Sequence, residues 1–454
     1  MDTKKLRQKI LDLAIRGKLV PQDPADEPAS VLLERIKAEK EQLIKEGKIK
    51  RSKKSSKTTD TPHYQNVPFE VPSGWVWTTI EEICSKIGSG STPRGSNYSA
   101  NGIPFFRSQN VYNDRLVYDD IKYISEEVHQ KMKGTEVLAN DLLLNITGGS
   151  LGRCAVVPTD FNCGNVSQHV CIMRSVLVEP EYFHALVLSS FFAKSMKITG
   201  SGREGLPKYN LEQMGFPLPP LAEQQRIVAE IERWFALIDR TEQDKTDLQT
   251  FIAQTKSKVL DLAIHGKLVP QDPTDEPAIE LLKRINPDFT PCDNGHYENL
   301  PDGWCVCKLE DVVDYEQPQL YIVESTSYSD RYETPVLTAG KSFIIGYTNE
   351  TYGICNKLPV IIFDDFTTDS KYVDFPFKVK SSAMKILHVK SGVETKFISL
   401  VMSITRLISE THKRYWISEY SKLDILLPPQ QEQKRIVNHV ESIFNRFDKI
   451  AEEL

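Results

Sequence analysis

The chain carries several segments twice, and this repetition constrains its fold more than any other feature. LDLAIRGKLVPQDPADEPA (Leu11–Ala29) returns as LDLAIHGKLVPQDPTDEPA (Leu260–Ala278), with 17 of 19 positions identical. Two further pairs share this pattern: PPLAEQQRIVAEIERWFALID (Pro219–Asp239) with PPQQEQKRIVNHVESIFNRFD (Pro428–Asp448), and VPSGW (Val71–Trp75) with LPDGW (Leu300–Trp304). Because internal repeats dictate architecture, we expect two structurally equivalent parts.

The repeated pieces follow a circular order. In the middle of the chain, PPLAEQQRIV runs through a polar stretch directly into LDLAIHGKLV. At the two ends the same unit is divided, with Leu454 corresponding to Lys245 and Met1 to Thr250, so joining the ends would rebuild it apart from residues 246–249. We therefore expect a pseudo-two-fold arrangement in which the termini lie close together.

The shared unit is predicted to be a long amphipathic helix. Residues 221–265 contain neither Gly nor Pro, and their apolar residues recur mostly at spacings of three, four or seven. Pro219 and Pro220 would begin this helix and Gly266 would end it, which gives a rod of roughly 65 Å. The divided copy carries the same stripe, at Ile436, Val440, Ile443, Phe447, Ile450, Leu6, Ile10 and Leu13. Two such stripes favour an antiparallel coiled-coil pair. The alternative is that each helix packs only on its neighbouring domain.

The two regions between the repeats are unlike each other, and each alternates short strand-like runs with turns and one helix. Strands are predicted at 102–111, 141–148, 152–158 and 169–176, and again at 358–365, 372–380 and 383–390. Helices are predicted at 180–198 and 394–411. The fold class is therefore α+β, with two α+β domains separated by the helical spacer.

This organisation divides the chain into seven parts. They are the first half of the split helical unit (1–47), a basic linker (48–67), a first domain (68–217), the central helical spacer (218–285), a shorter link (286–297), a second domain (298–427), and the other half of the split unit (428–454). The basic linker is Ser/Thr-rich and poor in apolar residues, so it is predicted to be flexible. Non-specific contact with DNA phosphates is the alternative role.

Composition narrows the class of protein. A formal net charge of −6 is weak evidence against nucleic-acid binding. The 8 cysteines form no CxxC pair, and Cys305 and Cys307 are predicted to be alternating strand residues, so we expect no metal site. We see no apolar signal region and no run long enough to span a bilayer, and the longest candidate is 182–193. A reduced, cytoplasmic protein without membrane contact is expected.

Several short motifs in this order resemble one family closely. They are GSGSTP (Gly88–Pro93), NGIPFFRSQNV (Asn101–Val111), GSLGRCAVV (Gly149–Val157), PLPPLAEQQRIV (Pro217–Val228), IIFDDFTTDSKYVDFPF (Ile361–Phe377) and ILLPPQQEQKRIV (Ile425–Val437). Together with two unlike domains and a duplicated helical unit, they resemble the specificity subunit of a Type I restriction-modification enzyme. The resemblance covers nearly the whole chain.

This resemblance implies a function without catalysis in this chain. Each variable domain would be a target-recognition domain that reads one half of a split target in double-stranded DNA, and the helix pair would fix the gap. Two methyltransferase subunits would use S-adenosylmethionine to methylate adenine, and restriction subunits would use ATP and Mg to translocate and cleave DNA. If both domains read one face of a duplex, the half-sites would lie about one helical turn apart.

Possible catalytic motifs are weak, so we expect no catalytic residues. GSGREG (Gly200–Gly205) fits a dinucleotide loop, but a predicted helix precedes it and Pro207 follows it. NPDF (Asn286–Phe289) departs from the adenine-methyltransferase signature at Asp288. DDFTTDSK (Asp364–Lys371) is predicted to be an acidic turn rather than a nuclease site. The alternatives to a DNA reader are a self-contained methyltransferase or nuclease, and a scaffold for protein assembly.

Candidate DNA contacts are polar residues of the predicted turns, because Arg, Asn and Gln read base edges while Lys and small hydroxyls bind phosphates. In the first domain they are Ser91, Thr92, Arg94, Arg107, Gln109, Asn110, Arg153, Gln168, Arg203, Lys208 and Tyr209. In the second they are Lys341, Thr367, Thr368, Lys371, Tyr372, Lys413, Arg414 and Tyr415. Candidate contacts with the methyltransferase subunits are Glu223, Gln224, Glu432 and Gln433, for which helix capping is the alternative role.

Overall fold

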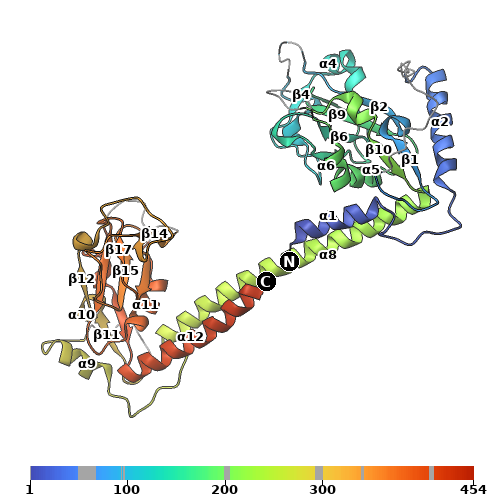
Figure 1. Cartoon of the computed structure of the whole chain (residues 1–454). Coiled ribbons are helices and arrows are strands. Elements are labelled where there is room, and N and C mark those ends of the chain that lie inside the picture. The colour runs from blue at the N-terminus through green and yellow to red at the C-terminus, as the bar shows by residue number, and fades with distance from the viewer. Residues whose placement is uncertain are drawn as a thin grey trace. The chain divides into compact units, whose positions relative to one another are not determined.

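The computed structural model describes residues 2–49, 68–93, 95, 98–198, 205–291, 300–338, 342–407 and 414–453. The chain divides into two compact units, Met1–Gln243 and Asp244–Leu454. The longest helix, α8 (Leu221–Ile264), passes from the first unit into the second. Each unit is described by itself below (Figure 1).

The first unit holds α1 to α7, β1 to β10 and the beginning of α8. Its helices are α1 (Thr3–Ala14), α2 (Ala29–Lys45), α3 (Ile80–Ile83), α4 (Glu126–Lys131), α5 (Pro180–Val187), α6 (Ser190–Ser195) and α7 (Lys208–Glu212). Its strands are β1 (Val76–Thr79), β2 (Cys84–Ser89), β3 (Ile103–Phe106), β4 (Lys122–Ile124), β5 (Glu136–Val137), β6 (Leu142–Asn145), β7 (Cys154–Val156), β8 (Gly164–Val166), β9 (Val170–Ser175) and β10 (Gly215–Leu218). Short 3-10 turns are η2 (Ser108–Asn110), η3 (Lys133–Thr135) and η4 (Gly148–Ser150).

The second unit repeats this plan. Its helices, apart from the end of α8, are α9 (Ala278–Ile285), α10 (Leu309–Val312), α11 (Thr395–Ile404) and α12 (Gln430–Glu453). Its strands are β11 (Cys305–Lys308), β12 (Val313–Glu316), β13 (Thr334–Leu337), β14 (Ile344–Thr348), β15 (Val360–Asp364), β16 (Ser370–Val373), β17 (Lys378–Val379), β18 (Met384–Val389) and β19 (Asp424–Leu427). Its 3-10 turns are η5 (Pro318–Tyr321) and η6 (Tyr420–Lys422).

Most strands of the two domains correspond, and among the described residues β5 alone has no counterpart. A four-stranded antiparallel sheet of order β2-β9-β6-β7 in the first domain matches β12-β18-β15-β16 in the second. A second sheet, β4-β3-β8-β5, matches β14-β13-β17, and each contains one parallel pair, β3 with β8 and β13 with β17. The entry and exit strands pair as β1 with β10 and β11 with β19. Two domains with different sequences therefore have similar topologies, and both are α+β as predicted.

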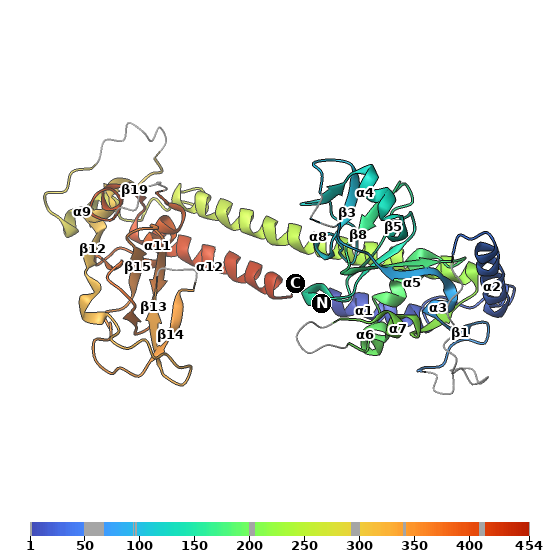
Figure 2. The ribbon, with the colours of Figure 1, turned by 90° about the horizontal axis from the view of Figure 1, so that it is seen from above.

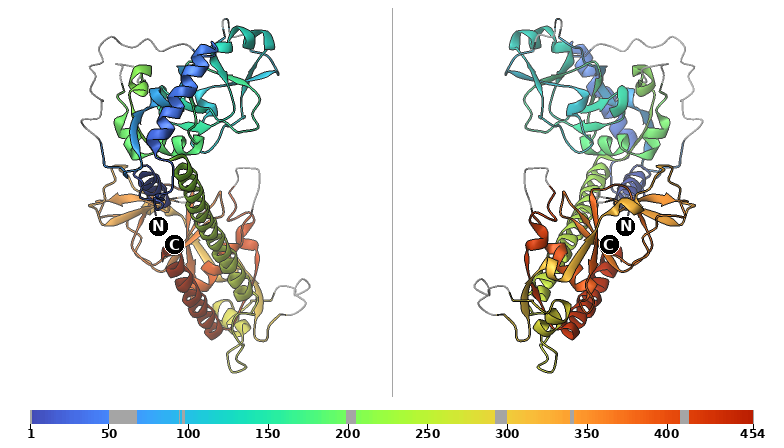
Figure 3. Two further views of the ribbon diagram at one scale, coloured as in Figure 1. Left: turned by 90° about the vertical axis from the view of Figure 1, so that its right-hand side faces the viewer. Right: turned by 90° about the vertical axis from the view of Figure 1, so that its left-hand side faces the viewer.

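Antiparallel helix packing occurs within each unit. In the first, Arg7 of α1 lies 2.5 Å from Asp239 of α8, while Ile10 and Leu11 share a core with Ile231. In the second, α12 runs along the other end of α8 (Figure 1, Figure 2 and Figure 3). Lys256 lies 2.5 Å from Asp448, and the side chains that pack further along are Val259, Ala263, Ile436, Val437 and Val440. The predicted helical spacer is confirmed, and the alternative of helices packed only on their domains is wrong.

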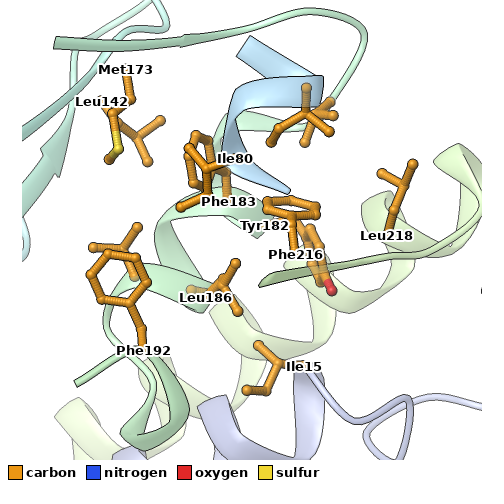
Figure 4. Packing of buried hydrophobic residues seen from close by; sticks show 14 of the residues in the cluster. Ile15, Ile80, Leu142, Met173, Tyr182, Phe183, Leu186, Phe192, Phe216 and Leu218 are labelled. Carbon is orange, nitrogen blue, oxygen red and sulfur yellow. The ribbon is translucent and has the colours of Figure 1, made fainter. Parts of the chain in front are cut away.

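Each helix pair also continues into the core of its domain. Ile15, directly after α1, is buried in the same cluster as Tyr182, Phe183 and Phe216 (Figure 4). The Tyr182 hydroxyl donates a hydrogen bond to the Pro217 carbonyl (2.7 Å), and its ring meets that of Phe216 edge-on at 5.9 Å. This shared core ties the exit strand β10 to the helices of the first unit, and a second core ties β19 to α8 and α12 in the second unit.

The structure corrects three predicted elements. The helix expected over 180–198 is interrupted, because the Ser189 side chain accepts a hydrogen bond from Phe192 N–H and begins a new helix, α6. The strand expected over 372–380 is two strands, β16 and β17, which belong to different sheets. The strand expected over 102–111 ends at Phe106, and the 3-10 turn η2 follows it. In all three places a local polar or proline-containing turn overrides the apolar run. Cys305 and Cys307 lie on β11, as the strand prediction requires.

Candidate DNA interface

In each domain several turns meet at one edge of the central sheet. In the first domain β2 and β6 end where β7 and β9 begin, so the turns at 90–93, 146–153 and 167–169 are neighbours. In the second, the same register brings together 317–323, 365–369 and 380–383. We call these sets the first and the second turn edge. Turns held by a rigid sheet are where proteins commonly carry binding groups.

Three predicted DNA contacts gather at the first turn edge. Ser91, Thr92 and Gln168 are all exposed. The Thr92 hydroxyl hydrogen-bonds the side-chain carbonyl of Gln168, and Ser91 N–H donates to the Val166 carbonyl (3.1 Å). Hydroxyl and amide groups are therefore presented together from segments that are far apart in the sequence.

Arg153 lies at the same edge, directly before β7, beside an aromatic ring that the sequence analysis missed. Its guanidinium carbon is 4.9 Å from the ring centroid of Tyr112, and that of Arg115 is 5.9 Å from the same ring. Tyr112 is 39 % exposed. Stacking on an aromatic face orients an arginine without neutralising it. In the sequence, an aromatic residue between polar turn residues could have indicated Tyr112 as part of this site.

The η2 turn beside this edge contains one predicted contact that the structure corrects. Asn110 is buried, and its amide donates to the carbonyls of Val117 (3.0 Å) and Asp119 (3.2 Å) while its oxygen accepts from Arg107 N–H (3.1 Å). It therefore shapes the turn and is not available to read DNA. Gln109 is exposed, and the half-buried Arg107 donates to the Asp120 carbonyl.

Helix α7 adds two exposed candidates next to the first turn edge. Gly205, just before it, bridges Thr147 of the β6–β7 turn. Tyr209 is 57 % exposed, and Lys208 pairs with Glu212 at 3.2 Å on the helix surface. Arg94 and Arg203 lie outside the described residues.

At the second turn edge, Thr367 and Lys371 are exposed in and after the β15–β16 turn. The Thr367 hydroxyl hydrogen-bonds Asp369 (3.3 Å). Tyr372 is half-buried on β16, with the Lys396 ammonium 5.5 Å from its ring centroid. These residues surround the acidic turn that the sequence predicts between two strands, and that prediction is confirmed.

Two further candidates at this edge are buried, which corrects the prediction that they contact DNA. The Thr368 side chain accepts a hydrogen bond from Leu407 N–H (3.2 Å), and its backbone has a φ of 59°. Tyr415 is 2 % exposed within the hydrophobic core. Arg414 is exposed, with its guanidinium 5.9 Å from the ring centroid of Phe366. Lys341 and Lys413 lie outside the described residues.

A hollow of about 310 Å³ opens beside the β15–β16 turn. Its polar lining includes Asp369, Lys371 and Arg406, and Arg406 lies 2.8 Å from Asp369. Sequence analysis missed Arg406 because it falls near the end of a predicted helix. Basic and acidic groups therefore alternate around this turn, in a setting suited to base edges as well as phosphates.

Comparison with known proteins settles the family. The model of the family described as "Type I restriction modification DNA specificity domain" matches residues 72–250 and 301–454. The chain belongs to this family. The specificity subunit of the Type I restriction enzyme EcoAI from Escherichia coli is 31 % identical over 381 residues, which cover 69 % of this chain. That of EcoR124I/EcoR124II from Escherichia coli is 44 % identical over 170 residues, or 35 % of this chain. The matches span 62 % and 42 % of those relatives' lengths.

Solved structures agree on the fold of this specificity-domain family. The HsdS subunit from Thermoanaerobacter tengcongensis aligns with a TM-score of 0.51 and 18 % identity, covering 85 % of this chain and 93 % of that one. A chain from a study of complex assembly and conformational transition of the type I R-M system aligns with a TM-score of 0.57 and 18 % identity, covering 85 % and 94 %. Among the described residues, no helix combines the length and hydropathy needed to cross a bilayer.

The predicted partner contacts of this specificity-domain chain lie in its interior. Glu223, Gln224, Glu432 and Gln433 are each at most 1 % exposed. Glu223 accepts hydrogen bonds from the Trp75 indole (2.9 Å) and the Gln22 amide (3.0 Å). Gln224 accepts from Glu179 N–H (2.9 Å) and donates to the Pro219 carbonyl (3.0 Å). These side chains offer no surface to a separate subunit. Glu223 and Gln224 cross-link the start of α8 to its domain, and helix capping stays the alternative role.

The same cross-links occur at the start of α12. Glu432 accepts from the Trp304 indole (3.1 Å) and the Gln271 amide (3.1 Å), and Gln433 accepts from Glu394 N–H (2.8 Å). Burial raises the pKa of the Glu432 carboxyl group, although the hydrogen bonds from Gln271 and Trp304 act to lower it. An outer ion pair accompanies each junction, Arg226 with Asp26 and Arg435 with Asp275, at 2.5 and 2.6 Å. The repeated VPSGW and LPDGW motifs therefore serve to fasten a domain to its helix.

Two of the motifs considered as possible catalytic sites contain residues that bond within the fold. In DDFTTDSK, Asp365 is buried, accepts from Trp416 N–H (2.8 Å) and lies 3.4 Å from Lys385. In NPDF, Asn286 follows α9 and its side chain accepts from Asp288 N–H (3.1 Å), which makes a local turn. GSGREG lies outside the described residues apart from Gly205.

Proposed function

We propose that this chain is the DNA sequence-recognition subunit of a Type I restriction-modification complex. Each domain reads one half of a bipartite target in double-stranded DNA, and the helical spacer sets the unread gap. One observation carries this proposal: two domains of similar topology, fastened to the starts of α8 and α12 by equivalent Trp-Glu junctions, differ in the turns at their edges. A duplicated scaffold with two different turn edges suits two different half-sites.

The chemistry of the exposed and half-buried candidates supports direct reading of bases. Arg153, Gln168 and Gln109 carry the groups that bond guanine and adenine in the major groove. Thr92, Lys208 and Lys371 suit phosphate contacts, which position a protein without specifying sequence. The remaining exposed or half-buried candidates with such groups are Ser91, Arg107, Tyr209, Thr367, Tyr372 and Arg414. Arg94, Arg203, Lys341 and Lys413 remain candidates for the same role.

In this proposal the chain itself is not catalytic. Two methyltransferase subunits bind S-adenosylmethionine and methylate adenine, and restriction subunits use ATP and Mg to translocate and cleave DNA. These subunits contact surfaces other than the buried Glu-Gln pairs, whose hydrogen-bonding groups are used inside the chain. Such a complex would work in the cytoplasm.

A methylome tests this proposal. The chain would be expressed with a Type I methyltransferase subunit in a host that lacks other adenine methylation, and N6-methyladenine would be mapped by single-molecule sequencing. We expect a bipartite motif that disappears when either chain is omitted. Methylation by this chain alone would make it an enzyme, and the absence of any motif with its partner would contradict sequence recognition.

A further inference from the structure

Among the described residues, the two turn edges differ in the length of chain between the first strand and its contact with the neighbouring sheet. In the first domain the chain passes from β2 directly to the end of β8, where Ser91 N–H meets the Val166 carbonyl. In the second, β12 ends at Glu316, and Ile322 is the residue that bridges Val379 of the corresponding strand β17. Residues 317–321 therefore lengthen this connection, and residues 318–321 of them form η5.

Buried groups fix the entry of this turn. Lys385 is 1 % exposed, and its ammonium donates to the Gln317 side-chain carbonyl (2.9 Å) and lies 3.4 Å from Asp365. The Tyr321 hydroxyl donates to Glu316 (2.9 Å) at the end of β12. The two ends of η5 are thus bonded to the sheet beneath it.

A second buried lysine fixes the exit. Lys378 is 1 % exposed, lies 2.7 Å from Glu350 and donates to the Tyr352 carbonyl (2.9 Å). Glu350 in turn accepts the N–H groups of Glu324 (3.0 Å) and Ser325 (2.9 Å). Burying two ammonium groups is costly unless they are paired, and paired networks of this kind rigidify the backbone they bond.

The tip of this fixed turn is open to solvent. Leu320 is 74 % exposed, Tyr352 is 56 % exposed and Gln319 is exposed. The Leu320 carbonyl lies so close to Gly353 that a Cβ there would approach it to 2.5 Å. A rigid backbone that presents a leucine and a glutamine side by side is preorganised for an external contact.

We propose that η5 reads an A·T base pair in the half-site of the second domain. Gln319 bonds the adenine edge and Leu320 contacts the thymine methyl group, which are the partners that an amide and an apolar side chain select in the major groove. Lys357, which interacts electrostatically with Glu316, and Lys380, at the end of β17, are exposed on neighbouring segments and supply positive charge for the adjoining phosphates. This inference rests on the proposed function.

Methylomes of Gln319→Ala and Leu320→Ala, each with the methyltransferase partner, test the inference. At one position of one half-site, we expect the preference for A·T over the other base pairs to fall by roughly fivefold to a hundredfold. The other half-site should be unchanged. Leu177→Ala is the matched control, because Leu177 is an exposed leucine (40 %) beyond β9, at the opposite end of the first domain's sheet. Its motif should equal that of the wild type.

Thermal unfolding of each variant should match the wild type, since both substituted side chains are exposed. A motif identical to the wild type in both variants would overturn the role of η5, as would an equal loss at every position of both half-sites. If the wild-type chain gives no bipartite motif with its partner, the proposed function itself fails.

Discussion

At the scale of the residue, a buried Trp-Glu hydrogen bond joins each domain to the start of a long helix. The indoles of Trp75 and Trp304 donate to carboxylates that are almost fully buried. Trp304→Phe removes the donor but keeps an aromatic ring, so we expect the free energy of unfolding of the second unit to fall by about 1–3 kcal/mol. Trp75→Phe should do the same in the first unit.

Calorimetry or urea unfolding of the full chain measures this effect. Trp234→Phe is the control, because Trp234 is 36 % exposed on α8 and its loss should change stability by less than about 0.5 kcal/mol. Equal effects of all three substitutions would show that the junction hydrogen bonds do not stabilise the domains.

The carboxyl group of Glu432 should give the second unit a pH-dependent stability. Burial raises its pKa above the ordinary 4.5, so the folded state binds its proton to a higher pH than the unfolded state. Its contribution to stability therefore falls as pH rises from about 4.5 through the folded pKa, and is constant above it. Compared with Glu432→Gln, the wild-type melting temperature should decline over that window. If the melting temperatures of the two proteins changed with pH in parallel from pH 4.5 upward, this assignment would be contradicted.

Arg153 is the candidate base reader of the first domain whose orientation is best defined. Arg153→Ala should reduce the preference for one base pair over the others, at one position of the first half-site, by roughly fivefold to a hundredfold. Arg115→Ala is the matched control, because Arg115 lies over the same Tyr112 ring but pairs with Asp114. A methylome measures both variants. An unchanged motif with Arg153→Ala would remove this residue from the interface.

At the scale of the element, α8 is the proposed ruler between the half-sites. Inserting four residues after Asp244 lengthens the helix by about 6 Å and turns its apolar stripe by only about 40°. We expect a methylated motif with both halves unchanged and a gap wider by about one or two base pairs. Inserting two residues turns the stripe by about 200°, so it should weaken helix packing and methylation instead. A gap that stays constant in the four-residue variant would contradict the ruler.

Elements differ in how far the sequence predicts them. The 3.6-residue periodicity of α8 and α12, and the motifs repeated around them, predict the spacer because the same residues that form the pattern make the contacts. Turn residues follow no such rule. Asn110, Thr368 and Tyr415 have the polar groups of a DNA reader but are buried, since their burial depends on partners distant in the sequence. Tyr112 was missed because the sequence does not show that Arg153 and Arg115 lie over its ring.

At the scale of the whole molecule, the duplicated plan makes each domain a self-contained module. The first unit fastens its domain through Glu223 and Gln224 and the second through Glu432 and Gln433, with the same hydrogen-bond pattern. Because the junction residues are shared and the turn edges are not, we expect that one domain can be exchanged without disturbing the other. Proximity of the two termini stays a prediction.

The most direct test of this account is a domain exchange followed by a methylome. Residues 68–217 would be replaced by the corresponding domain of another member of the family, with the junction residues Trp75, Glu179 and Pro217 matched, and the chain expressed with its methyltransferase partner. We predict a bipartite motif in which one half changes to that of the donor while the other half and the gap stay as in the wild type. A motif that changes in both halves, or in neither, would contradict the modular reader.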